Sequence, residues 1–144
     1  MKTKLTVLVS GIIMFTVFLG MYLLPLVPPP SKDVDLKVVK VDGTWKVVLA
    51  SDYTKTEVKV KKKDVIIWTA DGTDVSFQFP DFLFDPVGAD DSLHNGYTKF
   101  LKDGKTLKLK IKDNVTPGTY EYAVFCTSDG TFAIGGSPPK IIVE

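Results

Sequence analysis

The stretch KKKDVIIWTADGTDVSFQF, at residues 61–79, decides the fold class of this chain. Residues 65–68 form a short apolar run, an Asp71-Gly72 pair follows as a turn signal, and apolar and polar residues then alternate over 75–79. Short runs of β-branched and aromatic residues bounded by turn signals are typical of strands. We therefore expect two strands joined by a tight turn. The first should be covered on both faces, because its apolar run is continuous.

Similar patterns continue on both sides of this stretch. An Asp42-Gly43 turn separates alternating residues at 34–38 and 45–49, which is a strong hairpin signal. No stretch after residue 31 has a helical period, so the sequence predicts an all-β domain over residues 31–144, a Greek-key β-sandwich of two sheets. Further strand patterns lie at residues 57–61, 97–101, 107–111, 120–124 and 140–144. The expected core includes Trp45, Trp68, Phe77, Tyr120, Tyr122 and Ile142.

Residues 1–30 differ in composition from the rest and predict a membrane anchor with a proline-rich spacer. The uncharged stretch from Leu5 to Val27 would cross a hydrocarbon core of about 30 Å as a single transmembrane helix, at about 1.5 Å per residue. Lys2 and Lys4 precede it, and positive charge stays in the cytoplasm. We expect a single-pass protein of the cell membrane with its C-terminal domain on the extracytoplasmic side. A cleaved signal peptide is the alternative.

Charge and length exclude several classes of protein. All 18 basic residues of the 144 are lysines, against 17 acidic residues, and near-neutral charge without arginine argues against a nucleic-acid partner. The residues after the anchor suffice for one core and are too few for two ordinary domains. The chain has one Cys and one His, and a Cys nucleophile needs a base beside it. We therefore expect no catalytic residues and no enzyme activity.

Two segments, KDVIIWT at 63–69 and PGTYEY at 117–122, resemble strands of the cupredoxin family, and the chain closes on a short apolar strand as cupredoxins do. The resemblance implies a cupredoxin-like sandwich. The type 1 copper site of that family needs two His and one Cys, usually with a weak axial Met. Here Asp74 falls near the position of the first His, and no His follows Cys126. We expect a cupredoxin-like domain that lacks the type 1 copper ligands and has no cofactor.

An unusual metal site is the alternative that the residues leave open. Asp74, His94, Cys126 and Asp129 are its candidate ligands, for copper-dependent electron transfer or copper handling. The other interpretation is that Cys126 is a packed strand residue and that His94 is a solvated loop residue. The acidic segment 80–96 carries carboxylates of the kind that suit Ca²⁺, but its spacing matches no EF-hand loop.

The binding prediction concerns the loop at residues 127–139, which takes the position of the family's ligand loop. The resemblance implies a partner-docking patch there, formed by Phe132, Ala133 and Ile134. We expect a non-catalytic binding module, or an accessory subunit of a larger membrane complex. An Ig-like adhesion or self-assembly module is a further alternative. The lysine run 61–63 is interpreted as a solvated turn that blunts a sheet edge, with contact to anionic lipid as the alternative.

Overall fold

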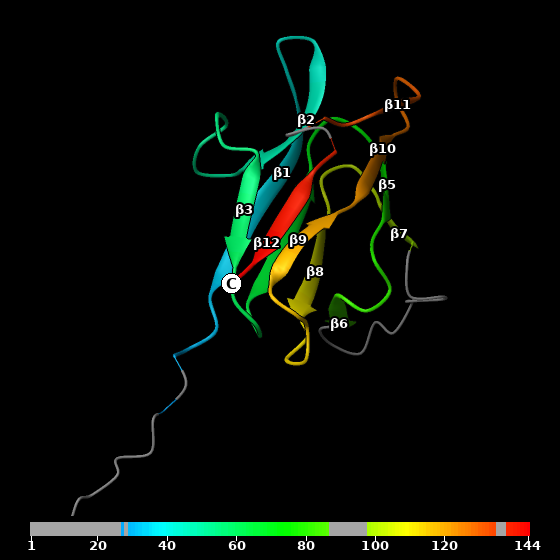
Figure 1. Cartoon of the computed structure of the whole chain (residues 1–144). Coiled ribbons are helices and arrows are strands. Elements are labelled where there is room, and N and C mark those ends of the chain that lie inside the picture. Colours follow the sequence, from blue (N-terminus) through cyan, green and yellow to red (C-terminus); the bar gives the residue numbers. More distant parts are fainter. Residues whose placement is uncertain (1–26, 28, 87–97, 135–137) are drawn as a thin grey trace, which may run out of the picture.

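The computed structural model describes residue 27 and residues 29–86, 98–134 and 138–144 (Figure 1). The secondary structure of this part is β throughout, as predicted. Its strands are β1 (Asp33–Val41), β2 (Thr44–Leu49), β3 (Glu57–Val60), β4 (Val65–Ala70), β5 (Val75–Gln78), β6 (Phe84–Pro86), β7 (Thr98–Leu101), β8 (Thr106–Ile111), β9 (Gly118–Glu121), β10 (Ala123–Cys126), β11 (Thr131–Phe132) and β12 (Lys140–Val143).

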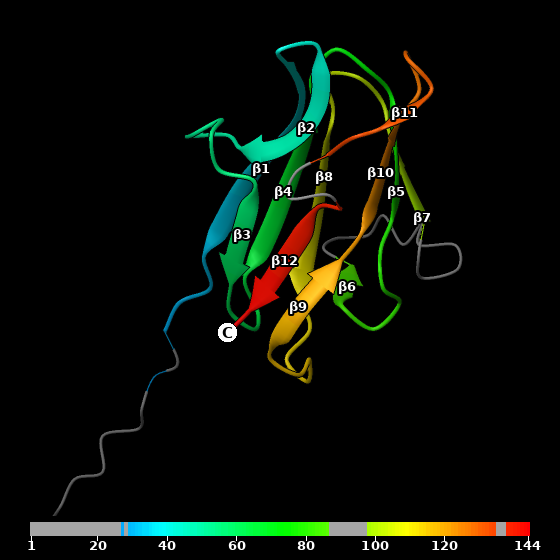
Figure 2. The ribbon, with the colours of Figure 1, turned by 45° about the horizontal axis from the view of Figure 1, so that its top comes forward.

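The strands form two facing layers. One layer is a sheet in the order β2-β1-β4-β8-β6, in which β1 and β4 run parallel. The other layer contains the sheets β3-β12-β9 and β11-β10-β5-β7. Figure 2 shows β12 and β9 in front of β4 and β8. Pairs such as β1–β4 and β3–β12 are not consecutive in the chain, so its connections cross over, as a Greek-key sandwich requires.

The core between the layers is built around Trp68. Its side chain is fully buried, and its ring lies 5.8 Å from that of Phe77, 5.1 Å from Phe79, 5.7 Å from Phe84 and 6.0 Å from Tyr122. The indole Nε1 donates a hydrogen bond of 3.2 Å to the hydroxyl of Tyr122, so both polar groups are satisfied inside the core. This aromatic cluster joins β4 of one layer to β5 and the β9–β10 junction of the other.

Most of the predicted core is confirmed, with one error of register. Trp45, Trp68, Phe77 and Tyr122 are buried. The last strand instead buries Ile141 and Val143 and leaves Ile142 half-buried. Successive side chains of a strand point to opposite faces, so an error of one residue exchanges the whole set.

Tyr120 is also half-buried, packed against the edge of the core. Its hydroxyl donates a hydrogen bond to the carbonyl oxygen of Thr116, four residues earlier. This bond holds the turn that leads into β9, so Tyr120 stabilises a strand entry rather than filling the core.

The prediction that both faces of the β4 run are covered was wrong. Ile66, Trp68 and Ala70 are buried, whereas Val65 and Ile67 are half-buried. Charged residues of the neighbouring strands stand opposite these two outward positions; Ile67, for example, pairs with Asp35 on one side and Lys108 on the other. The outer face of this layer therefore meets water, although β4 itself is a central strand.

Residues 84–86, within the acidic segment 80–96, form the strand β6, which pairs with β8. The sequence predicts that Phe82, Leu83 and Phe84 tuck under the sheet edge, and Leu83 and Phe84 are indeed buried. Phe82 is exposed, and its ring lies 5.6 Å from that of Tyr120. The rest of the connection, residues 87–97, lies outside the described residues, and His94 with it.

The predicted transmembrane helix at 5–27 cannot be compared with the structure, since residues 1–26 lie outside the described part. Within the described residues, no helix has the length and apolar character needed to cross a membrane.

Candidate functional site

Asp129 connects the β1–β2 hairpin to the turn that follows β10. Its Oδ2 accepts hydrogen bonds from Lys40 Nζ at 2.6 Å and from Trp45 Nε1 at 2.9 Å. These donors, Lys40 first, hold the pKa of Asp129 below its usual range. The carboxylate thus links the β1–β2 hairpin to the turn after β10, and its Oδ2 is engaged by two hydrogen-bond donors.

Cys126 lies at the end of β10 with its side chain fully buried. Burial is the main cause that raises the pKa of its thiol to about 11, and the negative charge of Asp129 adds to the effect. A thiol with this pKa stays protonated at neutral pH, whereas nucleophilic attack requires the thiolate. The surroundings of Cys126 agree with the packed-residue interpretation.

Asp74 supports backbone groups of neighbouring loops. Its Oδ1 accepts a hydrogen bond of 2.8 Å from the amide of Asp103, and its carbonyl oxygen accepts one of 3.0 Å from the amide of Thr127. Among the described residues, no group of three or more His, Cys, Asp or Glu side chains is placed to hold a metal ion. Asp129 lies near enough to Cys126 to act on its thiol, but this pair alone does not make a metal site.

We therefore expect that added copper produces no absorption band of a type 1 (blue) copper site. Full-length protein in detergent, titrated with Cu(II), should develop no intense thiolate-to-copper absorption in the visible region, because one chain holds one His where a type 1 site needs two. A stoichiometric band that disappears in Cys126→Ser would contradict this expectation. Circular dichroism of the variant would establish that the loss is not caused by unfolding.

The predicted docking patch contains two exposed residues and one buried residue, because successive side chains point to opposite sides of the chain. Phe132 and Ile134 are exposed, at 62% and 41%, whereas Ala133 is 3% exposed and its amide donates a 2.7 Å hydrogen bond to the carbonyl of Val124. The backbone of Ile134 pairs with β2 through hydrogen bonds to Trp45 and Val47, whereas Phe132 lies in β11 and pairs with β10. Ala133 therefore belongs to the core, and Phe132 faces a different neighbourhood.

That neighbourhood is the outer face of the sheet β11-β10-β5-β7. Register places Phe132 opposite Phe125, Phe125 opposite Ser76, and Ser76 opposite Phe100. The rings of Phe125 and Phe132 are in edge-to-face contact at 5.2 Å, and Phe100 is 57% exposed. We call Phe100, Ser76, Phe125 and Phe132 the aromatic row. At about 4.8 Å per strand it crosses the sheet over roughly 14 Å.

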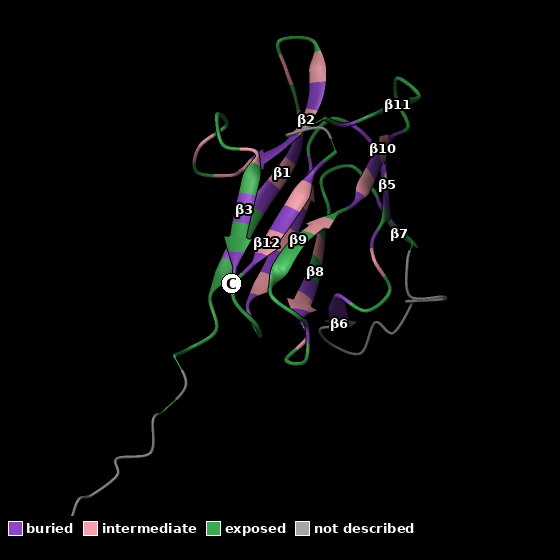
Figure 3. Ribbon diagram, in the orientation of Figure 1, coloured by how far each residue is buried: buried purple, intermediate pink, exposed green. Residues whose placement is uncertain are grey.

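On one side of the aromatic row the neighbouring residues carry no charge, whereas on the other side the chain continues to Asp74 and to the exposed Lys102. Ala123, Gln78 and Thr98 form the adjacent row of the same outer face, because Ala123 pairs with Gln78 and Gln78 with Thr98. Figure 3 shows that β11, at one end of the face, is exposed. Phe132 was predicted from the sequence as a docking residue, whereas Phe100 and Phe125 were not. In the sequence, Phe100 and Phe125 each lie between two residues that point inward: Lys99 and Leu101, and Val124 and Cys126. The strand pairing that places the two Phe residues in one row is not visible in the sequence.

No protein-family model matches the chain, and no curated protein matches its sequence. Similar solved structures include a methionine-to-glutamine variant of amicyanin with Cu(I), at 16% identity and a TM-score of 0.42, covering 78% of this chain and 82% of that one. An oxidised methionine-to-leucine variant of amicyanin has 18% identity and a TM-score of 0.39, covering 79% and 82%. This distant likeness carries nothing about copper or partners to the chain. The described part is a β-sandwich with crossing connections, and one chain with one His and one Cys lacks the two His and one Cys of a type 1 copper site.

Proposed function

We propose that this protein is a membrane-tethered, extracytoplasmic binding module without catalytic activity. Through its aromatic row it docks an uncharged, apolar surface of a protein partner and so serves as an accessory subunit of a membrane complex. The observation that carries the proposal is the alignment of Phe100, Phe125 and Phe132 on one solvent-facing sheet surface. The tether rests on the uncharged stretch from Leu5 to Val27.

The chemistry of the face selects the kind of partner. Aromatic side chains supply much of the binding energy at protein interfaces, because they bury large areas at a small cost in conformational entropy. The neighbouring Ser76, Gln78 and Thr98 offer hydroxyl and amide groups but no charge. A strongly charged partner, such as a nucleic acid, would lose hydration on this face without gaining an opposite charge. A protein surface that is apolar at its centre is the complementary occupant.

The proposal is tested by crosslinking in the native membrane. A photoreactive amino acid at position 100 or 132 of the full-length protein should capture one partner in carbonate-washed membranes, and the same probe at position 53 should not. Tyr53 is the matched control because it is also an exposed aromatic residue, at 42%, next to the other layer. Recovery of the protein in the carbonate supernatant would contradict the tether.

Phe100→Thr combined with Phe132→Thr is expected to weaken partner capture by at least about tenfold, since central aromatic residues of an interface each contribute about 2 kcal/mol or more. Threonine keeps the β-branched shape that strands favour, so the fold should persist in circular dichroism. Tyr53→Thr should leave capture unchanged. Equal capture by the double variant and the unaltered protein would remove the aromatic row from the interface.

A further inference from the structure

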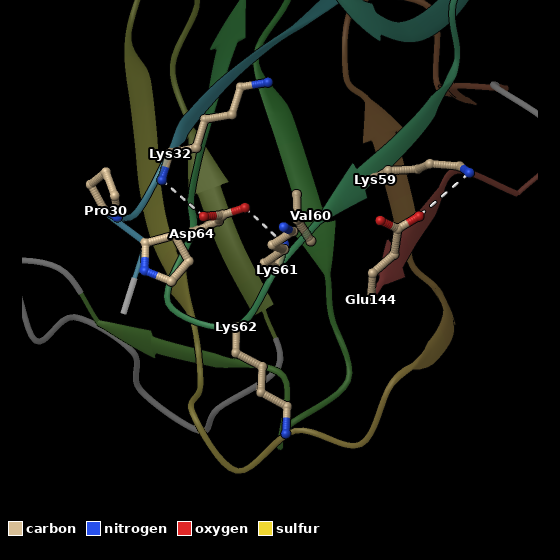
Figure 4. Close-up of a pocket in the computed structure, with 9 residues that line it drawn as sticks. Pro30, Lys32, Lys59, Val60, Lys61, Lys62, Asp64 and Glu144 are labelled. Atoms are coloured by element: carbon tan, nitrogen blue, oxygen red, sulfur yellow. Dashed lines mark hydrogen bonds and ion pairs between the residues drawn. The ribbon is translucent and has the colours of Figure 1, made fainter. Parts of the chain in front are cut away.

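A second surface lies at the end of the domain where the chain enters β1. Pro29, Pro30, Lys32, Lys59, Val60, Lys61, Lys62, Asp64 and Glu144 line a hollow of about 310 Å³ there (Figure 4). Figure 1 shows the start of β1 beside the C-terminus at this end. We call this hollow the lysine pocket. It contains four lysines and two acidic residues, so its net charge is +2.

The two acidic residues of the lysine pocket are already engaged. Asp64 is 7% exposed, and its carboxylate accepts hydrogen bonds of 2.8 Å from the amide of Lys32 and 2.7 Å from the amide of Lys61. Glu144 pairs with Lys59 at 3.4 Å. Within the described part of the chain, the ammonium groups of Lys32, Lys61 and Lys62 form no ion pair. These ammonium groups are therefore free to meet an anion.

The turn that carries Lys61 and Lys62 is fixed by its own hydrogen bonds. The amide of Asp64 donates to the carbonyl of Lys61 at 3.1 Å, while the Asp64 side chain holds the amide of Lys61 from the other direction. Figure 4 shows Asp64 between Lys32 and Lys61, with Lys62 extending outward. The buried carboxylate thus fixes the backbone at Lys32 and at Lys61, and Figure 4 shows the side chains of Lys32 and Lys62 extending from it in opposite directions.

The spacer between the proposed anchor and the domain is short, so it holds the lysine pocket near the membrane surface. Lys32 follows Val27, the end of the uncharged stretch, by five residues. A proline-rich spacer extends about 3.1 Å per residue, so the pocket lies within roughly 16 Å of the hydrocarbon edge. The headgroup layer fills about 5–8 Å of that distance, and charge acts over a further 8–10 Å at physiological salt.

We propose that the lysine pocket binds the anionic phosphate headgroup of a membrane lipid and thereby fixes the orientation of the domain on the bilayer. The inference rests on the proposed membrane tether. A headgroup phosphate is a compact anion that accepts hydrogen bonds from ammonium groups, and Lys61 and Lys62 present two of them on one fixed turn without an ion pair among the described residues. Bound in this way, the domain presents the aromatic row away from the lipid, since β10, β11 and β7 lie at the far side in Figures 1 and 2.

A neighbouring hollow provides an internal comparison. Lys32, Asp33, Val34, Asp35, Leu49, Ala50 and Ser51 line it, with one lysine and two acidic residues and hence a net charge of −1. It lies on the same side of the domain and shares Lys32 with the lysine pocket. Proximity to the membrane would affect both hollows, whereas headgroup binding concerns only the positive one. Lys61 and Lys62 line only the lysine pocket, so their reactivity tests headgroup binding more specifically than that of Lys32, which lines both hollows.

The test measures lysine acetylation, residue by residue, in full-length protein reconstituted in vesicles. Phosphatidylcholine vesicles are compared with vesicles that also contain phosphatidylglycerol. Lys61 and Lys62 should react roughly fivefold more slowly in the anionic vesicles, and this protection should fall as salt is raised. Lys102 and Lys105 should react equally in both, because they lie in the turn bonded to Ala70, at the opposite end of β4 from Asp64.

Variants show whether the protection comes from the pocket. Lys61→Gln should abolish the protection of Lys62, and Lys62→Gln that of Lys61, whereas Lys102→Gln combined with Lys105→Gln should leave both protections intact. Equal acetylation of Lys61 and Lys62 in both kinds of vesicle would overturn the proposal. Equal protection by inorganic phosphate with neutral vesicles would also overturn it, since the site would then bind free phosphate rather than lipid.

Flotation separates this inference from the tether on which it rests. Protein that fails to float with neutral vesicles has no anchor, and the proposed tether is then wrong. Headgroup binding is still measurable in that case. Headgroup binding then predicts that the protein floats with anionic vesicles and that the variant with both Lys61→Gln and Lys62→Gln does not. If the unaltered protein also fails to float with anionic vesicles, headgroup binding is refuted.

Discussion

Trp68→Ala is expected to lower the free energy of unfolding by about 3–5 kcal/mol, the range for removing a large aromatic side chain from a packed core. Trp68 contacts four other aromatic rings and is fully buried, so the surrounding side chains cannot close the cavity without breaking several ring contacts. The substitution also leaves the hydroxyl of Tyr122 without its donor. Since whole domains are stable by about 5–15 kcal/mol, the loss takes much of the available stability.

Chemical denaturation followed by circular dichroism measures this loss. Trp68→Phe provides a folded variant if the alanine variant is too unstable, since it keeps most of the apolar volume but removes the indole N–H. Tyr122→Phe removes the other half of the hydrogen bond and should cost about 1–3 kcal/mol, because a buried donor is left unsatisfied. A loss below about 1 kcal/mol in Trp68→Ala would mean that the aromatic cluster does not form the centre of the fold.

The same cluster explains how far the fold could be predicted. Asp-Gly turns and period-2 alternation locate Trp45 and Phe77 on inward faces, because both signals are local in the sequence. The last strand has no alternation of apolar and polar residues from which its inward face could be predicted. KIIVE at 140–144 is apolar at three consecutive positions, so its pattern fits either face, and the pairing of Ile141 with Val58 and Tyr120 decides that Ile141 points inward.

The surfaces were harder to predict than the core, for a related reason. Phe100 and Phe125 are 25 residues apart in the sequence, and each pairs with Ser76 from a different strand. A row of this kind depends on the register of three strand pairs, and a single slip would turn one ring to the other face. The lysine pocket likewise joins the start of β1, the end of β3 and the C-terminal residue. In the sequence, only the run at 61–63 stands out.

The proposed metal ligands illustrate the limit of ligand counting. The sequence placed Asp74, Cys126 and Asp129 in one region of the fold, and the structure does bring Asp129 near Cys126. What the residue types could not reveal is that Asp129 binds Lys40 and Trp45 and that Cys126 faces the core. Both side chains stabilise the end of the sandwich from which the loop to Phe132 emerges. Packing there can influence the proposed docking face without any metal.

Cys126 is expected to resist thiol reagents strongly in the native protein. Raising the pKa of the thiol from 9.0 to about 11 lowers the thiolate fraction near pH 8 by about a hundredfold, and the buried position excludes the reagent as well. Native protein should therefore react at least about a hundredfold more slowly than denatured protein at the same pH. Cys126 is the chain's one cysteine, so the signal has a single source. Rapid labelling of the native protein would contradict the buried placement and reopen a functional role for the thiol.

The raised pKa also predicts how stability depends on pH. Between about pH 9 and pH 11 the unfolded chain loses the thiol proton while the folded chain keeps it, so deprotonation favours unfolding and stability falls as pH rises through this window. Lysines titrate at the upper end of the same range, and Cys126→Ala removes only the thiol contribution. The free energy of unfolding should therefore fall less steeply with pH in Cys126→Ala than in the unaltered protein. Parallel curves for the two proteins would show that the thiol titrates alike in the folded and unfolded chains, and would refute burial as the force that holds its proton.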